Sequence, residues 1–205
     1  MRKLIIPAFI SLDGVMQAPG GPEEDTSGGF AHGGWVWPYA DESEEVMGGV
    51  FSRPFELLLG RRTYDIFAAY WPHVLEGAPH RGIADMFNGT VKHVATRRPD
   101  TLDWQNSRAL GPDVAAEVRE LKRGDGPNLV TQGSSDLVHQ LLATDLVDEL
   151  CLLVYPILLG RGKRLFDDRA HASAFRLEAS KATSTGVLVN RYVREGDVQT
   201  GSFAP

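Results

Sequence analysis

The sequence has little cysteine, no excess of positive charge and no long hydrophobic run, and each shortage excludes a class of protein. Cys151 is the one cysteine among 205 residues, so no disulfide bond forms within the chain. The net charge of −6 argues against a nucleic-acid partner, because binding to phosphates requires a basic face. No segment approaches the roughly 18 apolar residues that cross a membrane, and the first residues lack the pattern of a signal peptide. We therefore expect a cytoplasmic protein with neither a nucleic-acid nor a membrane partner.

Metal-binding patterns are also missing from the sequence. The six histidines are scattered, and no two of them have the spacing of metal ligands. Neither a Cys-x-x-Cys nor a His-x-Glu pattern occurs, so the chain is not a zinc deaminase. We expect no metal site.

Short apolar runs alternate with helical patterns along the whole chain. Strands are predicted at residues 4–10, 55–59, 91–95, 102–105, 128–132 and 147–156, and helices at 41–50, 63–70, 83–87, 112–122 and 135–142. This order predicts a three-layer α/β/α fold with a mainly parallel, mixed sheet. A C-terminal antiparallel hairpin, 175–182 with 187–193, is expected at one edge. No linker divides residues 1–205, so they form a single domain, with a loose tail at 195–205.

Residues 17–34 form a loop of unusual length that is rich in glycine and proline. Such a loop within a compact domain is either a functional lid or a disordered excursion, and we favour a lid.

Three predicted strand ends carry residues suited to binding anions. Gly60, Arg61, Arg62 and Thr63 follow one strand; Thr96, Arg97 and Arg98 follow another; Gly133, Ser134 and Ser135 follow a third. Ligands of open α/β sheets bind beyond the carboxyl ends of the strands. Helix N-termini with free N–H groups, together with guanidinium donors, favour phosphate there. A serine at a helix start is more often a structural cap, but three such sites together indicate a binding site.

Several segments resemble a known superfamily. Residues 57–64, Leu-Leu-Leu-Gly-Arg-Arg-Thr-Tyr, resemble a strand–helix junction of dihydrofolate reductase-like proteins. Residues 130–135, followed by Leu137, resemble the second glycine junction of that group, and residues 11–14, Ser-Leu-Asp-Gly, also fit it. Segment 148–166 is the most distinctive and is similar to the C-terminal reductase domain of the bifunctional riboflavin-biosynthesis deaminase-reductase. The resemblance spans residues 2–194.

The resemblance implies NADPH binding and hydride transfer to a small heterocyclic substrate. The best-matching reaction reduces the ribosyl carbon of 5-amino-6-(5-phosphoribosylamino)uracil to a ribityl group. Gly60, Arg61, Arg62 and Thr63 would then hold the cofactor phosphates. Thr96, Arg97 and Arg98 would hold the adenosine 2′-phosphate, and Gly133, Ser134, Ser135 and Leu137 would surround the pyrophosphate and nicotinamide. Relatives in this group often pair, so a homodimer is expected.

Candidates for the remaining roles each have a plainer alternative. Asp41 matches the buried carboxylate of folate reductases, or it is a solvated acid at a helix start. Asp13 either lines the nicotinamide pocket as a catalytic residue or makes a turn. Trp37 either stacks on the substrate or packs in the core, and Arg161 either binds a substrate phosphate or belongs to an exposed basic loop.

Departures from the family pattern leave two other functions open. Where folate reductases have a run of glycines, this chain has Gly-Ser-Ser at 133–135, and its loop 17–34 is longer than theirs. One alternative is reduction of a dihydrofolate or another pterin, with Asp41 as the acid. The other is a non-catalytic nucleotide-binding protein.

Overall fold

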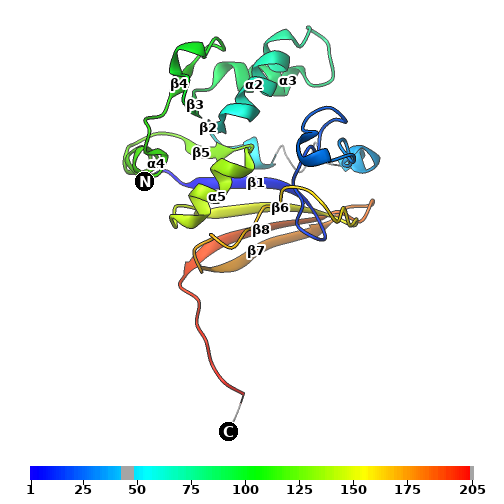
Figure 1. The fold of residues 1–205 in the computed structure, drawn as a ribbon, viewed down its shortest axis with the longest axis vertical. Helices are drawn as coiled ribbons and strands as arrows, with labels where there is room; N and C mark the ends of the chain where they lie inside the picture. Colours follow the sequence, from blue (N-terminus) through cyan, green and yellow to red (C-terminus); the bar gives the residue numbers. More distant parts are fainter. Residues whose placement is uncertain (43–48, 204–205) are drawn as a thin grey trace.

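A computed structural model describes residues 1–42 and 49–203. Its centre is an eight-stranded sheet in the order β4-β3-β2-β5-β1-β6-β8-β7 (Figure 1). The strands are β1 (Leu4–Ser11), β2 (Phe55–Gly60), β3 (Lys92–Ala95), β4 (Ser107–Ala109), β5 (Asn128–Thr131), β6 (Glu149–Tyr155), β7 (Ala174–Ala182) and β8 (Leu188–Gly196). Strands β1 to β6 are parallel, whereas β8 runs antiparallel to β6 and β7 antiparallel to β8. The predicted mixed sheet with its C-terminal hairpin is confirmed.

Helices cover both faces of the parallel part of the sheet. They are α2 (Arg61–Tyr70), α3 (Arg81–Gly89), α4 (Val114–Arg123) and α5 (Ser135–Ala143), joined by short 3-10 turns at Ser27–Gly29, Trp37–Glu42, Trp71–His73 and Pro99–Thr101. Leu4 and Ile6 of β1 pack with buried residues of α4 and α5, whereas the intervening Ile5 packs with Tyr64 of α2 and Phe87 of α3. This alternation follows from the two-residue period of a strand. It gives the predicted three layers.

Strand β1 lies at the centre of the sheet, between β5 and β6. Ile5 is in register with Val130 of β5 on one side and with Glu149 of β6 on the other. Because β1, β2 and β5 are parallel, their carboxyl ends meet at one edge of the sheet. The loops that follow these three strands therefore lie together.

The predicted strand at 102–105 is wrong, because the fourth strand begins at Ser107. The Trp104 backbone N–H donates to the Tyr64 hydroxyl at 2.9 Å, and the Gln105 carbonyl accepts from the buried Lys92 ammonium at 2.8 Å. Trp104 itself is buried, with its indole N–H donating to Asn88. Side chains therefore occupy backbone groups that a strand would need for its ladder.

Other boundaries differ less. Most of the predicted helix 41–50 falls on residues 43–48, outside the described part of the chain. Strand β8 continues to Gly196, two residues into the expected tail, and beyond it the chain leaves the body of the molecule (Figure 1). Among the described residues, no helix has the length and apolar character to span a bilayer.

Candidate functional site

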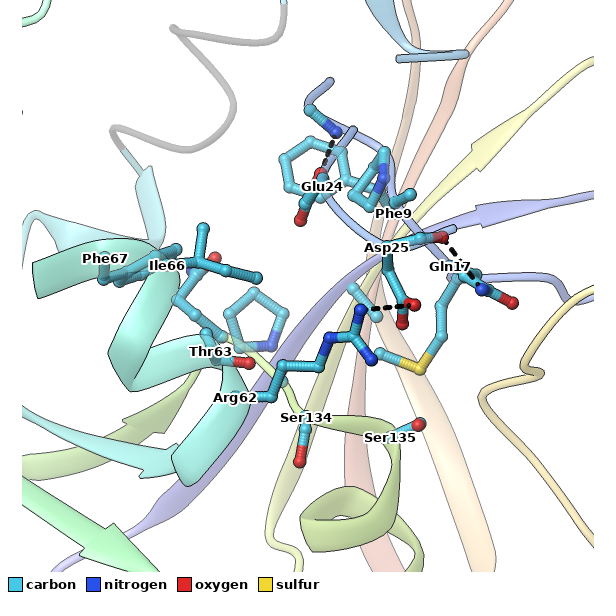
Figure 2. Close-up of a pocket in the computed structure, with 18 of the residues that line it drawn as sticks. Phe9, Gln17, Glu24, Asp25, Arg62, Thr63, Ile66, Phe67, Ser134 and Ser135 are labelled. Atoms are coloured by element: carbon cyan, nitrogen blue, oxygen red, sulfur yellow. Dashed lines mark hydrogen bonds and ion pairs between the residues drawn. The ribbon is translucent and has the colours of Figure 1, made fainter. Parts of the chain in front are cut away.

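A cavity of about 330 Å³ lies at the carboxyl ends of β1 and β5, between α2 and the loop that follows β1. This volume is at the lower end of the range for small-molecule pockets, about 300–1,000 Å³. Its wall combines residues of β1, the loop after it, α2 and the β5–α5 junction (Figure 2). Residues of α3 and Lys163 complete the wall. The cavity therefore gathers segments that are far apart in the sequence.

One side of the cavity is apolar and largely aromatic. Phe9 of β1, Phe67 of α2 and Trp71 contribute to it, together with Phe51, Ile66, Ile83 and Phe87. Phe67 stacks on Phe87 with ring centroids 5.7 Å apart, and Trp71 meets Phe87 edge to face at 5.1 Å. These contacts fix the rings, so the cavity offers a rigid flat surface to an aromatic or heterocyclic ligand.

The opposite rim is polar and is formed by two helix starts. Arg62 and Thr63 come from the first turn of α2, and Ser134 and Ser135 come from the start of α5 (Figure 2). Neither helix has a side-chain cap, since Gly60 has no capping atom and the Ser134 hydroxyl makes no cap hydrogen bond. The structural cap that a serine at this position usually provides is therefore not formed here.

Helix α4 provides the contrast within the same chain. Its N-cap Asp113 accepts a hydrogen bond from Ala116 N–H at 3.0 Å, and it contributes nothing to the cavity wall. The first N–H groups of α2 and α5 keep their donor capacity, and both helix dipoles are positive at this end. An anionic group on the ligand is favoured at this rim.

The β2–α2 and β5–α5 junctions pack so closely that their glycines leave no room for a side chain. A Cβ built on Gly60 would lie 2.2 Å from Ser134 Oγ, 3.0 Å from Ser134 Cβ and 3.1 Å from Ser134 N. Gly133 has φ +103°, a conformation that favours glycine, and its peptide bond to Ser134 is cis. A Cβ at Gly133 would also lie 3.1 Å from Thr63 Oγ1. Glycine at both positions lets the two helix starts meet.

Loop 17–34 forms the remaining side of the cavity, with Gly20, Glu24 and Asp25 in the wall. The side-chain amide of the buried Gln17 donates to the backbone carbonyls of Asp25 and Ser27. The backbone carbonyl of Gln17 accepts from the Trp35 indole N–H at 2.8 Å. The loop is thus a packed segment with fixed internal contacts, in the position expected of a lid.

Asp25 joins the loop to the two cations of the cavity wall. Its carboxylate lies 2.8 Å from Arg62 of α2 and 2.7 Å from Lys163 (Figure 2 shows the pair with Arg62). Burial raises the pKa of Asp25, but hydrogen bonds from Lys163 and Ser27 outweigh it and lower the pKa to about 2. Asp25 is therefore ionised, and its two ion pairs hold loop 17–34, α2 and Lys163 together.

Two further groups face the cavity although no sequence pattern indicated them as site residues. Glu24 is a partly buried carboxyl whose pKa is raised by burial, although its hydrogen bonds with Gly20 and Gly21 oppose the shift. The buried Nε2 of Gln132, at the end of β5, has no hydrogen-bond partner within the described residues. A carboxyl in a glycine-rich loop and a glutamine after a strand are both ordinary in a sequence, so only the fold brings them to the cavity.

The predicted cofactor residues divide into those in the cavity wall and those outside it. Arg62, Thr63, Gly133, Ser134 and Ser135 line the cavity. Gly60 lies directly behind it, where it packs on Ser134. Leu137, in the first turn of α5, is buried in the main hydrophobic cluster instead.

Arg61 is engaged by the protein itself. Its guanidinium donates to Asp65 at 2.8 Å, to Thr101 Oγ1 at 2.6 Å and to the carbonyl of Arg98 at 3.1 Å, with Thr96 Oγ1 at 3.4 Å. It therefore fixes the loop after β3 against α2, beside the cavity rather than in its wall. The structure thus brings the ends of β2 and β3 together through Arg61.

Within that loop, Arg97 and Arg98 are exposed. Arg98 lies 3.7 Å from Asp65, and Arg97 has no ion-pair partner among the residues that the structure describes. Both side chains remain accessible to an anionic ligand on this edge.

Asp13 stabilises a turn, which was the plainer of the two roles expected for it, and not a catalytic site. Its carboxylate accepts from Ser11 Oγ at 2.6 Å and from the N–H groups of Leu159 and Gly160 at 3.1 and 2.9 Å. The Ser11 hydrogen bond in particular holds the pKa of Asp13 far below its ordinary value. Asp13 lies outside the cavity wall and is ionised near neutral pH, so it does not serve as a proton donor there.

The other three candidates are placed as follows. Trp37 is 80% exposed and outside the cavity wall, so neither core packing nor a stack within this cavity applies to it. Arg161 is exposed and lines a second hollow of about 240 Å³ that shares Gln17 and Lys163 with the cavity. Asp41 lies in the 3-10 turn Trp37–Glu42, and its side chain is outside the described part of the structure. Across the described ranges, no cluster of histidine, cysteine, aspartate or glutamate has a metal-binding arrangement.

Comparisons with known proteins agree with the fold. The chain is 24% identical over 193 residues to the uncharacterised protein YwjB of Bacillus subtilis (strain 168), covering 94% of this chain and 98% of that protein. It is 23% identical over 191 residues to YyaP of the same organism, covering 91% and 92%. Both relatives have nearly the same length as this domain.

Two solved structures have the same fold. A putative riboflavin biosynthesis protein from Shewanella sp. PV-4 has a TM-score of 0.62 at 19% identity, covering 94% of this chain and 99% of that one. A pyrimidine reductase-like protein from Corynebacterium diphtheriae has a TM-score of 0.56 at 14% identity, covering 96% and 93%. The profile of the RibD C-terminal domain matches residues 2–189, nearly the whole chain. This chain belongs to the RibD C-terminal domain family, a reductase-type family, as the resemblance of its motifs predicted.

Proposed function

We propose that this protein is an NADPH-dependent reductase that acts on a small heterocyclic substrate of the riboflavin-pathway type. The observation that carries the proposal is the convergence of two uncapped helix N-termini and Arg62 on one rim of an otherwise aromatic cavity. Membership of the RibD C-terminal domain family supports it independently.

The residues present fit a nicotinamide dinucleotide. A pyrophosphate needs N–H donors and a cation, which Arg62, Thr63, Ser134 and Ser135 supply at the rim. A nicotinamide ring needs an apolar wall with few polar contacts, which the aromatic side supplies, and the unpartnered Gln132 Nε2 is a donor suited to a carbonyl oxygen. When bound, the reduced nicotinamide supplies a hydride.

The rest of the chain's contribution is binding and orientation. Thr96, Arg97 and Arg98 are the residues we assign to the adenosine 2′-phosphate, because the two arginines are exposed beside the rim. Arg161 and Lys163, in the adjoining hollow, would take a phosphate on the substrate. Loop 17–34, held by Asp25, excludes water from the reacting atoms.

The test is oxidation of NADPH by the purified protein, followed by the loss of reduced-nicotinamide absorbance with 5-amino-6-(5-phosphoribosylamino)uracil or dihydrofolate as substrate. We expect oxidation with the pyrimidine. Faster turnover of dihydrofolate would favour the pterin alternative instead. Binding of NADPH without oxidation by either substrate would favour a nucleotide-binding protein.

A further inference from the structure

Glu24 is the carboxyl group of the cavity that no other role accounts for. It sits on the loop side of the cavity, across from Ile66 and Phe67 of α2 (Figure 2). One oxygen, Oε2, accepts the Gly20 N–H at 2.7 Å, and a Cβ on Gly20 would lie 3.1 Å from it. The loop thus folds around this carboxyl and fixes it at the wall.

The surroundings of Glu24 raise the pKa of its carboxyl group above the ordinary value, although the N–H groups of Gly20 and Gly21 oppose the shift. Burial is the main cause of its raised pKa, and the neighbouring negative charge of Asp25 adds to it. The cations that face this region are Arg62 from α2 and Lys163 from the loop after β6, and both are paired with Asp25. Asp25 therefore engages both cations, and Glu24 has no ion-pair partner of its own among the described residues.

Reduction of a carbon–heteroatom bond requires a proton as well as a hydride. The hydride forms the new C–H bond, the bond electrons move to the oxygen or nitrogen, and that heteroatom then takes a proton. Within the described cavity wall, Asp25 is ionised, and histidine, tyrosine and cysteine are absent. Arg62 and Lys163 are held in ion pairs.

We propose that Glu24 is the catalytic acid of this cavity, an inference that rests on the proposed reductase function. Its carboxyl proton passes to the heteroatom that leaves the carbon reduced by the nicotinamide. For a ribosyl substrate this atom is the ring oxygen, whose bond to the anomeric carbon breaks as the C–H bond forms. The products are a ribityl hydroxyl, an oxidised nicotinamide and the Glu24 carboxylate, which regains its proton from water.

The first test measures the protonation of Glu24 without any reaction. The carboxyl carbons of a protein with 13C-labelled glutamate are titrated by NMR, and Glu24→Gln identifies the Glu24 signal by its loss. Glu23 is the matched control, since it is the preceding residue and is exposed. We expect the titration midpoint of Glu24 to lie above that of Glu23. A midpoint equal to or below that of Glu23 would overturn the proposal.

The second test compares turnover with cofactor binding. Glu24→Gln keeps the shape but removes the proton, so NADPH oxidation should fall about 10²–10⁴-fold while NADPH affinity is unchanged. Glu23→Gln should oxidise NADPH at the wild-type rate. The wild-type rate should also fall as the pH rises through the Glu24 midpoint, and the residual rate of Glu24→Gln should lack this dependence.

The outcomes separate the two proposals. If the wild type binds no NADPH, or if it fails to oxidise NADPH with either of the two substrates, the proposed function fails and the acid role fails with it. If the wild type turns over and Glu24→Gln does so at the same rate, the acid role alone is wrong. A loss of NADPH affinity that accounts for the whole loss of rate would make Glu24 a binding residue instead.

Discussion

Substitution of Gly60 by alanine tests whether the β2–α2 and β5–α5 junctions meet as described. The added methyl would lie 2.2 Å from Ser134 Oγ, which a rotation of the serine hydroxyl relieves. It would also lie 3.0 and 3.1 Å from Ser134 Cβ and N, which belong to the α5 start and move only with the backbone. Gly60 has φ −72° and ψ 155°, a conformation that alanine adopts freely, so the cost comes from crowding.

Overpacking of this kind costs about 1–3 kcal/mol of unfolding free energy. For a chain of this size that corresponds to a fall in Tm of about 2–4 °C for each kcal/mol. The measurement is a double-mutant cycle by urea unfolding with Gly60→Ala, Ser134→Gly and the double variant. Because Ser134→Gly removes the two closest atoms, the double variant should recover about 1 kcal/mol relative to the sum of the single changes.

Gly82→Ala in α3 is the matched control for this cycle. A Cβ on Gly82 would have no other atom within 4 Å, so replacing this glycine with alanine should stabilise α3 by about 0.5–1 kcal/mol. NADPH affinity should fall with Gly60→Ala, since the displaced α5 start lines the cavity, and should not change with Gly82→Ala. Additive energies in the cycle, or a Gly60→Ala variant as stable as the wild type, would refute the contact between the junctions.

Three further predictions concern other parts of the site. Gln132→Met removes a buried amide donor without a partner, so it should stabilise the free protein by about 1 kcal/mol in urea unfolding and yet weaken NADPH binding; a loss of stability would mean that the amide is paired. Arg97→Ala combined with Arg98→Ala should weaken NADPH about tenfold or more, as expected for lost charge-assisted hydrogen bonds, but leave NADH affinity unchanged; equal losses would reassign both arginines. Asp13→Ala should lower the unfolding free energy near pH 7 by about 1–3 kcal/mol. Because the pKa of Asp13 is depressed in the folded state, its contribution is complete above its ordinary pKa of 3.8 and disappears as the pH falls below it, so the wild type and the variant should converge in acid.

The strands and their helices were predictable from local patterns, whereas the partners of backbone groups were not. Leu57, Leu58 and Leu59 are apolar in a run because both faces of β2 are covered, which is the mark of a buried parallel strand. Segment 102–105, Leu-Asp-Trp-Gln, alternates apolar and polar residues as a half-buried strand does, but the Tyr64 hydroxyl and the Lys92 ammonium occupy its backbone groups. Those two side chains come from α2 and β3, so only the tertiary structure reveals their effect.

The site was predictable where it depends on strand ends and unpredictable where it depends on the loop. Arg62, Thr63, Gly133, Ser134 and Ser135 share the cavity because they follow parallel strands that end at one edge. Arg61 and Arg62 are adjacent and chemically identical in sequence, yet Arg61 holds the loop after β3 while Arg62 reaches the cavity.

Glu24 and Asp25 show why the part of the site formed by the loop could not be predicted from the sequence. They are neighbours in a glycine-rich loop, and one has a raised pKa while the other has a lowered pKa. The largest contribution that lowers the pKa of Asp25 comes from Lys163, 138 residues away, and hydrogen bonds from the nearby Ser27 add to it. No local pattern in the sequence encodes that contact.

The most direct test of the central claim is a titration of NADPH against the wild type and Arg62→Ala, followed by nicotinamide fluorescence. Arg119→Ala, an exposed arginine on α4 outside the cavity wall, is the control. The account predicts sub-millimolar binding to the wild type and the control, and about 10–100-fold weaker binding to Arg62→Ala, the loss expected for charge-assisted hydrogen bonds to phosphate. No fluorescence change with the wild type, or equal affinity in all three proteins, would contradict it.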